Sequence, residues 1–352
     1  MPARSRRQQT PSVRAGFFAF VTMRRFGNLF VEVASTNNLW RAWQDFSKGK
    51  RQRITVADFV WQAPQEVVSL HQQLMAENYR PQGYRLKMIH EPKHRLVAAA
   101  PVCDRIVHHA IYRILSPLLD PGLIRETWAC LQGRGSHRAQ IACVGAMRNY
   151  PWRMALDIRH YFPSIDHAIL LEEVMARRIK DRRLLELLRK ICRSGAGLYR
   201  HPGIGEFLDF PPGFPPDGCG LPIGNLTSQW QANHYLSGLD HHAKRVLGVP
   251  AYHRYMDDMV FFAHSKSQLQ ETRDAVAQWL WVYRRLKLKH PNAAIRSTKQ
   301  PMTWLGKRIS TAGINPSRRQ IRKMQCRMTT LVRQGDEETI RHAVASYRGV
   351  LL

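Results

Sequence analysis

Asp257 and Asp258 stand side by side in the stretch "HRYMDDMVFFAH", between Tyr255-Met256 and the apolar run 259–263. Two adjacent carboxylates repel each other, and burying either of them without a partner costs several kcal/mol. An exposed turn in water would tolerate the pair without any function. A bound cation would instead convert the repulsion into attraction. Such a site would be expected to contain further carboxylates.

Asp157 is the third candidate, because it is the only charged residue of the apolar stretch "MALDI". The alternative is an isolated carboxylate that accepts hydrogen bonds from backbone amides. A β-hairpin carrying Asp257 and Asp258 beside the Asp157 strand would bring three carboxylates together, which is untenable without cations. Two Mg²⁺ ions, or Mn²⁺ in their place, suit such a cluster and bind phosphate oxygens as well. The pattern therefore indicates two-metal phosphoryl transfer.

The net charge points to a polyanionic partner. The 352 residues include 54 Lys and Arg against 26 Asp and Glu, a formal charge of +28. An ordinary solvated surface accounts for a net charge of about 5 to 8. Nucleic acid is the first candidate partner and an anionic membrane surface the second. The basic residues are spread along the chain rather than gathered on one amphipathic helix, which disfavours the membrane.

Targeting and cysteine signals are weak. No apolar run approaches the roughly 20 residues that span a bilayer, and the short run 15–21 has no evident cleavage site for a signal peptide. The six cysteines show no CxxC spacing and no paired Cys/His pattern, so we expect neither a zinc site nor a disulfide framework. Reduced thiols in a cytoplasmic protein fit this pattern.

Periodicity and turn residues predict an α+β chain with an antiparallel sheet packed against helices. We expect Lys93 and Arg95 on one face of an extended strand, Asp157 within a strand, and Asp166 as a helix N-cap. The expected elements are helices over 37–79, a strand pair over 84–101, a helix over 103–120, a strand over 152–157, helices over 163–191, a Gly/Pro-rich loop over 195–220, a helix over 225–248, a hairpin over 252–263, a helix over 267–287, one short strand over 302–310 and a basic helical tail.

Five motifs in order resemble those of reverse transcriptases. They are "EPKHRLVAAAPVCDRIVHHAI", "LDIRHYFPSID", "LPIGNLTSQ", "YMDD" and "TWLG". The resemblance implies a right-hand polymerase fold with fingers, a palm built on an antiparallel sheet and a short helical thumb. It divides the chain into a basic arm over 1–34, fingers over 35–150, a palm over 151–310 that includes the 195–220 loop, and a thumb over 311–352.

The resemblance also implies roles for the carboxylates and one aromatic residue. By matched position, Asp157, Asp257 and Asp258 would be catalytic metal ligands, together with the carbonyl of Ile158. Phe162 falls where the family places the aromatic side chain that excludes a ribose 2′-hydroxyl, so DNA is the expected product. The alternative is that Phe162 is an ordinary core residue.

Further residues match the family's nucleotide and template positions. Lys93 and Arg95 match residues that clamp the incoming triphosphate, for which a bidentate arginine is suited; a generic basic strand edge is the alternative. The nucleotide site would also include Ile223, Gly224 and Gln229, with Gly224 allowing close approach of the backbone. The positions expected near template or primer are Arg105, Ser228, Tyr255, Trp304 and Gly306; Arg105 has solvent as its alternative.

One motif narrows the resemblance. Most of the family has Gln-Gly and Ser-Pro where this chain has Ile223-Gly224 and Ser228-Gln229. The form "IGNLTSQ" is similar to reverse transcriptases of diversity-generating retroelements. These enzymes copy a template-repeat RNA into cDNA with errors at template adenines, and typically work with a small basic accessory protein. A bacterial or phage origin would follow.

Two other functions stay open: a retron- or defence-associated reverse transcriptase, and a non-catalytic RNA-binding relative. The intact aspartates argue against the second. About 45 residues follow "TWLG", too few for an RNase H domain, an HNH endonuclease or a full maturase region, which weakens the mobile-intron alternative. The short thumb suggests truncation or a partner. Ala293 stands where many relatives have a lysine proposed as general acid, so that role is unassigned.

Overall fold

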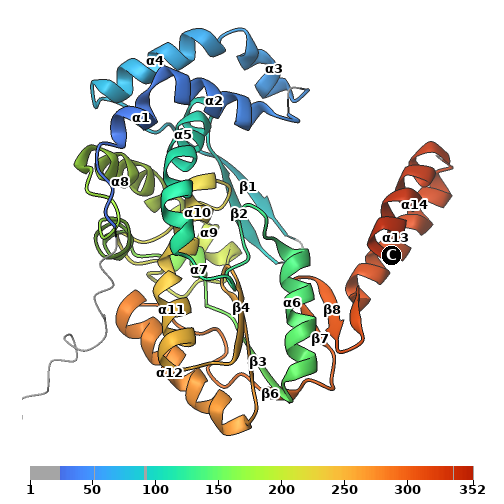
Figure 1. The fold of residues 1–352 in the computed structure, drawn as a ribbon. Coiled ribbons are helices and arrows are strands. Elements are labelled where there is room, and N and C mark those ends of the chain that lie inside the picture. Colours follow the sequence, from blue (N-terminus) through green and yellow to red (C-terminus); the bar gives the residue numbers. More distant parts are fainter. Residues whose placement is uncertain (1–23, 51, 91–92, 336, 352) are drawn as a thin grey trace, which may run out of the picture.

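Helices make up the beginning of the described chain. The computed structural model describes residues 24–50, 52–90, 93–335 and 337–351; most of the expected basic arm, and the apolar run 15–21, lie outside them. The first elements are helices α1 (Phe30–Ala34), α2 (Thr36–Ser47), α3 (Ile54–Val60) and α4 (Ala63–Met75). They lie together at one end of the molecule (Figure 1) and pack around α5 (Val102–Leu119). Helix α1 falls within the range expected as an arm, and its buried side chains join this helical core.

Helix α2 shows why the sequence folds this way. The Ser35 hydroxyl accepts a hydrogen bond from the Asn38 backbone amide at 3.2 Å, which caps the first turn. Leu39, Trp43 and Phe46 recur at helical spacing and are all buried. The prediction of helices in this region is confirmed.

A two-stranded hairpin separates α4 from α5. Strands β1 (Arg85–Ile89) and β2 (Arg95–Ala99) pair antiparallel, as predicted for the strand pair. Lys93 lies in the bend before β2, so the expectation that Lys93 and Arg95 share a face of one strand is wrong. The strand begins two residues later than the alternating pattern suggested.

The centre of the molecule is a four-stranded antiparallel sheet in the order β4-β5-β3-β6. Its strands are β3 (Trp152–Leu156), β4 (Ala251–Tyr255), β5 (Asp258–Ala263) and β6 (Ile295–Ser297). Side chains of β5 alternate between two cores: Met259 and Phe261 face the main helical core, whereas Val260 and Phe262 face a second cluster with α6 (Ser136–Asn149). Burial on both faces explains the unbroken apolar run. Asp157 follows the last residue of β3, a correction to its expected place within the strand.

Further helices follow α5 along the chain, and several of them pack against this sheet or against α5. They are η2 (Asp120–Gly122), α7 (Tyr161–Ser164), η3 (Ile169–Met175), α8 (Arg182–Ala196), η4 (Leu198–Arg200), α9 (Ile204–Phe207), α10 (Leu226–Tyr235), α11 (Ser237–His241), η5 (His242–Val246) and α12 (Lys266–Arg284). Asp166 Oδ1 accepts hydrogen bonds from the amides of Ala168 and Ile169, which confirms its capping role. The 195–220 range is not loop throughout, because it contains η4 and α9.

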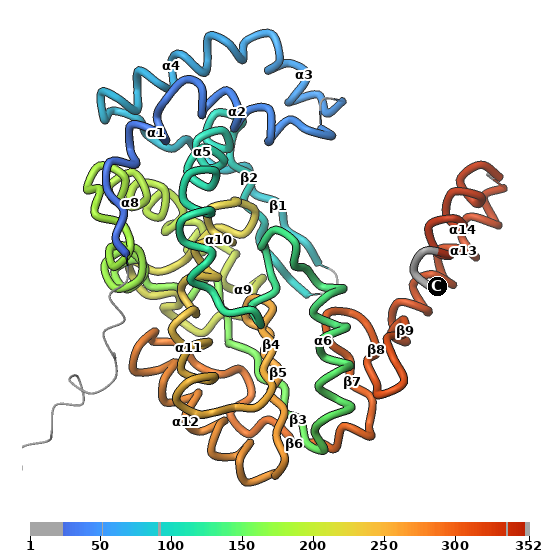
Figure 2. The backbone as a smooth tube through the Cα atoms, viewed as in Figure 1, coloured from blue at the N-terminus to red at the C-terminus, as the bar shows by residue number. Residues whose placement is uncertain are grey.

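The C-terminal part differs from the single short strand expected over 302–310. Strands β7 (Met302–Trp304), β8 (Lys307–Ser310) and β9 (Gly313–Pro316) form a separate three-stranded sheet beside α6 (Figure 2). Leu305 and Gly306 form the tight β7–β8 turn, and both have positive φ values, 49° and 79°. The turn was missed because Leu at a positive φ is uncommon.

Two helices, α13 (Arg318–Gln334) and α14 (Glu337–Leu351), complete the chain and project away from its main body (Figure 1). A capping box begins α13: the Ser317 hydroxyl accepts from the Gln320 amide, and the Gln320 side chain accepts from the Ser317 amide. The predicted basic helical tail is confirmed. Within the described chain, no helix has both the length and the apolar character needed to cross a membrane.

Candidate active site

Strand register brings the three aspartates to one end of the central sheet. Strands β3 and β5 pair antiparallel with Leu156 opposite Met259. The next residue on one strand and the previous residue on the other are therefore cross-strand neighbours, which sets Asp157 beside Asp258. Asp257 occupies the β4–β5 turn directly before Asp258. The juxtaposition inferred from the sequence is present.

Burial and mutual repulsion govern how these groups ionise. Burial raises the pKa of Asp257 to about 7, and the charges of Asp157 and Asp258 and a hydrogen bond with the Asp157 side chain add to the rise. The pKa of Asp258 is also raised, by burial first and then by Asp157. The charge of Asp157 thus raises the pKa of both neighbouring aspartates, and the three carboxylates form a site whose negative charge calls for a counter-charge.

Positive side chains surround the aspartates. Lys93, Arg95 and Lys289 each act to lower the pKa of Asp258, so their charges reach the carboxylate. Lys289 Nζ lies 3.8 Å from Asp157 Oδ2, and the Lys289 backbone amide donates to the Asp157 carbonyl at 2.8 Å. Lys289 was not among the site residues predicted from the sequence. In the sequence it is one basic residue of "LKLKHP", a pattern shared by many surface segments.

The three aspartates have the ligand chemistry of the metal ion expected from the sequence. Three neighbouring carboxylates offer the hard oxygen ligands that Mg²⁺ prefers, and burial together with the charges of Asp157 and Asp258 raises the pKa of Asp257. Within the described residues, no three Asp, Glu, His or Cys side chains converge closely enough to hold a metal ion in their present positions. The residue types at the site nevertheless fit Mg²⁺.

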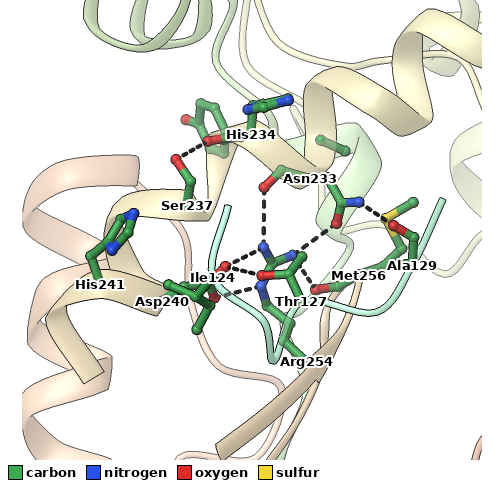
Figure 3. Close-up of polar contacts among 12 residues, drawn as sticks. Ile124, Thr127, Ala129, Asn233, His234, Ser237, Asp240, His241, Arg254 and Met256 are labelled. Atoms are coloured by element: carbon green, nitrogen blue, oxygen red, sulfur yellow. Dashed lines mark hydrogen bonds and ion pairs between the residues drawn. The ribbon is translucent and has the colours of Figure 1, made fainter. Parts of the chain in front are cut away.

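A buried ion pair supports the turn that carries Asp257. Arg254, on β4, is fully buried and donates from its Nε and Nη2 to Asp240 Oδ1 and Oδ2 at 2.7 and 2.5 Å. Its Nη1 donates to the Met256 carbonyl at 3.1 Å (Figure 3). Met256 has a φ of 57°, which a residue with a side chain rarely adopts. Arg254 therefore fixes the strained peptide immediately before Asp257.

The rest of this network satisfies the remaining polar atoms. Thr127 and Tyr252 donate their hydroxyls to Asp240 at 2.8 and 2.9 Å, and Arg254 also donates to Asn233. A buried ion pair is tolerated when additional hydrogen bonds saturate both partners. The pair was not predicted from the sequence, although an arginine inside the strand "AYHRYM" indicates that a buried partner is needed.

Gly224 lies where the hairpin and the central region meet. The Ala98 amide of β2 donates to the Ile223 carbonyl at 2.7 Å. Gly224 has a φ of 127°, and a Cβ there would lie 2.6 Å from the Ala98 carbonyl oxygen. Both the backbone angle and the contact require glycine, so this predicted residue has a demonstrable structural role.

The other predicted nucleotide residues lie on the β1–β2 hairpin, on α7 and on α10. Lys93 and Arg95 are exposed on the hairpin. Phe162, on α7, is partly buried against the main core, and its carbonyl accepts from the Leu221 amide at 2.9 Å. Gln229 accepts a hydrogen bond from the Cys130 thiol. Phe162 therefore contributes to the core, as the alternative interpretation of this residue expected, but its side chain is only partly buried.

The residues expected near template or primer are not gathered in one place. Arg105, in the first turn of α5, donates to the Ala100 carbonyl and lies over the Phe46 ring. Its side chain therefore contacts the protein and does not face solvent only. Trp304 and Gly306 belong to the β7–β8 hairpin beside α6. Of the remaining two template or primer positions, Ser228 is buried and Tyr255 pairs with Asp258 across the hairpin. Ile158, expected as a metal ligand through its carbonyl, directly follows Asp157, and its side chain is buried.

Comparison with known proteins identifies the family. The model of the family described as "Reverse transcriptase (RNA-dependent DNA polymerase)" matches residues 87–309. The chain belongs to the reverse transcriptase family. The match includes the β1–β2 hairpin from Lys87 onward, the whole central sheet and β7–β8. The predicted right-hand polymerase fold and the predicted enzyme class, an RNA-directed DNA polymerase, are thereby confirmed.

Two curated relatives are distant. Protein YkfC of Escherichia coli is 24% identical over 277 residues, covering 69% of this chain and 71% of the relative. An uncharacterised 91 kDa protein encoded in a cob intron of Schizosaccharomyces pombe is 26% identical over 140 residues, or 39% of this chain and 15% of that protein. Neither relative distinguishes a diversity-generating enzyme from other reverse transcriptases.

Solved structures of telomerases are also similar. Telomerase of Candida tropicalis without its C-terminal domain gives a TM-score of 0.43 at 12% identity, over 67% of this chain and 55% of that one. Telomerase of Candida albicans in complex with a telomeric RNA fragment gives 0.45 at 9% identity, over 68% and 46%. The chain thus spans about half the length of these structures. Because both scores are below 0.5, the fold assignment rests on the family match and the observed sheet.

Proposed function

We propose that Asp157, Asp257 and Asp258 are the metal ligands of the polymerase site and that the chain copies RNA into DNA there. The observation that carries this proposal is the β3–β5 register, which sets the three carboxylates together under mutual repulsion. Divalent ions, Mg²⁺ in the first instance, would activate the primer hydroxyl and stabilise the pyrophosphate leaving group. The Ile158 carbonyl is proposed as a further ligand.

The surrounding residues are assigned by their positions relative to the aspartates. Lys93 and Arg95, whose charges reach Asp258, would bind the triphosphate of the incoming nucleotide. Phe162 would contact the sugar and exclude a 2′-hydroxyl, so that dNTPs are accepted and rNTPs rejected. Gly224 would allow the backbone to approach the nucleotide.

Primer extension on an RNA template tests the proposal. With dNTPs and Mg²⁺ the parent chain should extend the primer, and Asp257→Asn should not. Asp274→Asn is the matched control, because Asp274 lies on α12 with 72% of its side chain exposed and pairs with the neighbouring Arg273. Extension by Asp257→Asn at the parent rate would refute the metal assignment.

We further propose that the chain belongs to the diversity-generating class and copies a template-repeat RNA with errors at adenines, together with a small basic accessory protein. The supporting feature is Ile223, which offers a branched apolar side chain where an amide would form hydrogen bonds. Sequencing the cDNA made from a template of mixed composition tests this. Errors concentrated at template adenines support the proposal, whereas errors spread evenly over the four bases favour a retron-type or defence-type enzyme.

A further inference from the structure

Residues 197–221, here called the linking segment, run from the end of α8 to the loop before α10 and contain η4 and α9. The end of the segment is fixed to the region that follows β3. The Leu221 amide donates to the Phe162 carbonyl and the Gly220 amide to the Ile165 carbonyl, both at 2.9 Å, while the His167 amide donates to the Gly218 carbonyl at 2.9 Å. The segment is therefore anchored close to the aspartates.

The middle of the linking segment packs on the β1–β2 hairpin. Leu96 of β2 forms a small separate core with Tyr199 and Ile204, and all three are 1% exposed. Tyr199 also donates its hydroxyl to the Leu221 carbonyl at 2.8 Å, so the same ring joins the hairpin core to the anchored end. A two-stranded hairpin is only marginally stable by itself. The segment supplies the apolar surface that this hairpin lacks.

A second contact lies at the tip of the hairpin, between the two exposed cations. The ring of His94 stacks on Phe207 with centroids 4.6 Å apart and planes 14° apart. His94 Nδ1 donates to the Phe207 carbonyl at 2.8 Å. Because His94 is flanked by Lys93 and Arg95, this contact constrains the backbone from which both cations extend.

The third contact is with the chain directly after Asp157. The ring of His160 lies 4.9 Å from Phe210 and 5.3 Å from Phe214. His160 has a φ of 47°, an uncommon backbone conformation for a residue with a side chain, and its ring contacts both phenylalanine rings. The linking segment thus contacts the aspartate side and the cation side of the site at once.

We propose that the linking segment positions the hairpin for nucleotide binding by holding Lys93 and Arg95 at a set place relative to Asp258. The proposal rests on the triphosphate-binding role given to these cations above. A long, flexible basic side chain binds phosphate more tightly when the backbone that carries it is already held in the binding position, since less conformational entropy is lost on binding. Phe207 and His94 act through the cations and are positioning residues.

Steady-state kinetics with Phe207→Ala and His94→Ala test the proposal. Each variant should raise KM for dNTPs about three- to tenfold, the loss expected for one aromatic contact, with kcat within about twofold of the parent. Phe207→Tyr, which retains a ring for stacking, should restore the parent KM. Trp61→Ala is the matched control, because Trp61 is 88% exposed on the first helices and its loss should leave KM unchanged.

Two further measurements separate positioning from general damage. Amide hydrogen exchange over residues 95–99 should accelerate in Phe207→Ala, whereas exchange over β3 and β5 should not. In an Arg95→Ala background, Phe207→Ala should raise KM by a smaller factor than in the parent, because part of its effect passes through Arg95.

Three results would overturn the inference: unchanged exchange in the hairpin, an unchanged KM in both alanine variants, or the full increase in KM in the Arg95→Ala background. A parent-like KM in Arg95→Ala alone would instead refute the phosphate-binding role of the hairpin. In that case the exchange measurement still decides whether the segment fixes the hairpin.

Discussion

The aspartates and the hairpin cations of the candidate site are supported in opposite ways. Asp258 begins β5, whose following side chains are buried on both faces of the sheet, and Asp157 directly follows β3. Asp257 lies in the turn whose Met256 carbonyl accepts a hydrogen bond from the buried Arg254. Lys93 and Arg95 are exposed on a two-stranded hairpin, whose contacts with the rest of the molecule include a small core, the His94–Phe207 stack and a backbone hydrogen bond from Ala98 to Ile223. The comparison indicates that the chemistry is tied to the rigid interior, whereas substrate contact is assigned to a more weakly held element.

The largest effect is expected at Asp157. Asp157→Asn should lower kcat about a thousandfold, corresponding to about 4 kcal/mol of lost transition-state stabilisation, while the fold is retained. In thermal unfolding, Mg²⁺ should raise the melting temperature of the parent but not that of the variant, because only the parent keeps the full ligand set. Equal Mg²⁺ shifts in both proteins would contradict the assignment.

The next effect concerns stability. Arg254→Met leaves Asp240 buried without its partner, which should lower the free energy of unfolding by about 3 kcal/mol. Urea unfolding measures the loss. Adding Asp240→Asn should cost less than the sum of the two single changes, since the unpaired charge disappears. Additive losses would show that the two residues contribute separately.

A smaller effect is expected on the hairpin. Arg95→Ala should raise KM for dNTPs about tenfold through the loss of a charged hydrogen bond, with no change in the free energy of unfolding beyond about 0.5 kcal/mol. Arg95→Lys should fall between the two, because it keeps the charge without the bidentate geometry. A loss of unfolding free energy in Arg95→Ala as large as that in Arg254→Met would show that the hairpin and the central sheet do not differ in this way.

The smallest effect in energy is at Ile223. Ile223→Gln introduces an amide beside the nucleotide site and should reduce errors at template adenines, with kcat changed by no more than about threefold. Sequencing of cDNA made by both proteins on the same template provides the measurement. An identical adenine error spectrum would show that Ile223 does not set fidelity.

The sequence alone was sufficient to predict the elements that local pattern determines. The helix that contains Leu39, Trp43 and Phe46 and the β4–β5 hairpin were expected because apolar spacing and turn residues specify them. The juxtaposition of Asp157 with Asp258 was inferred from the carboxylates themselves, and the β3–β5 register agrees with it. Family resemblance supplied the enzyme class.

Features that depend on distant contacts were not predictable in this way. Lys289 is a surface-type residue by pattern and reaches Asp157 only through the tertiary fold. The β7–β8 turn is formed by Leu305 at an uncommon backbone angle. The pairing of Asp240 with Arg254 joins a helix to a strand, and no local spacing indicates it.

The antiparallel register of β3 and β5 also limits how this chain can change in length. Successive side chains of a strand point to opposite faces, so gaining or losing one residue in β3 would exchange its two faces. Met154 and Leu156 would leave the main core, and the carboxylate of Asp157 would turn away from Asp258. Variants of this strand that keep polymerase activity should therefore differ in length by two residues or not at all.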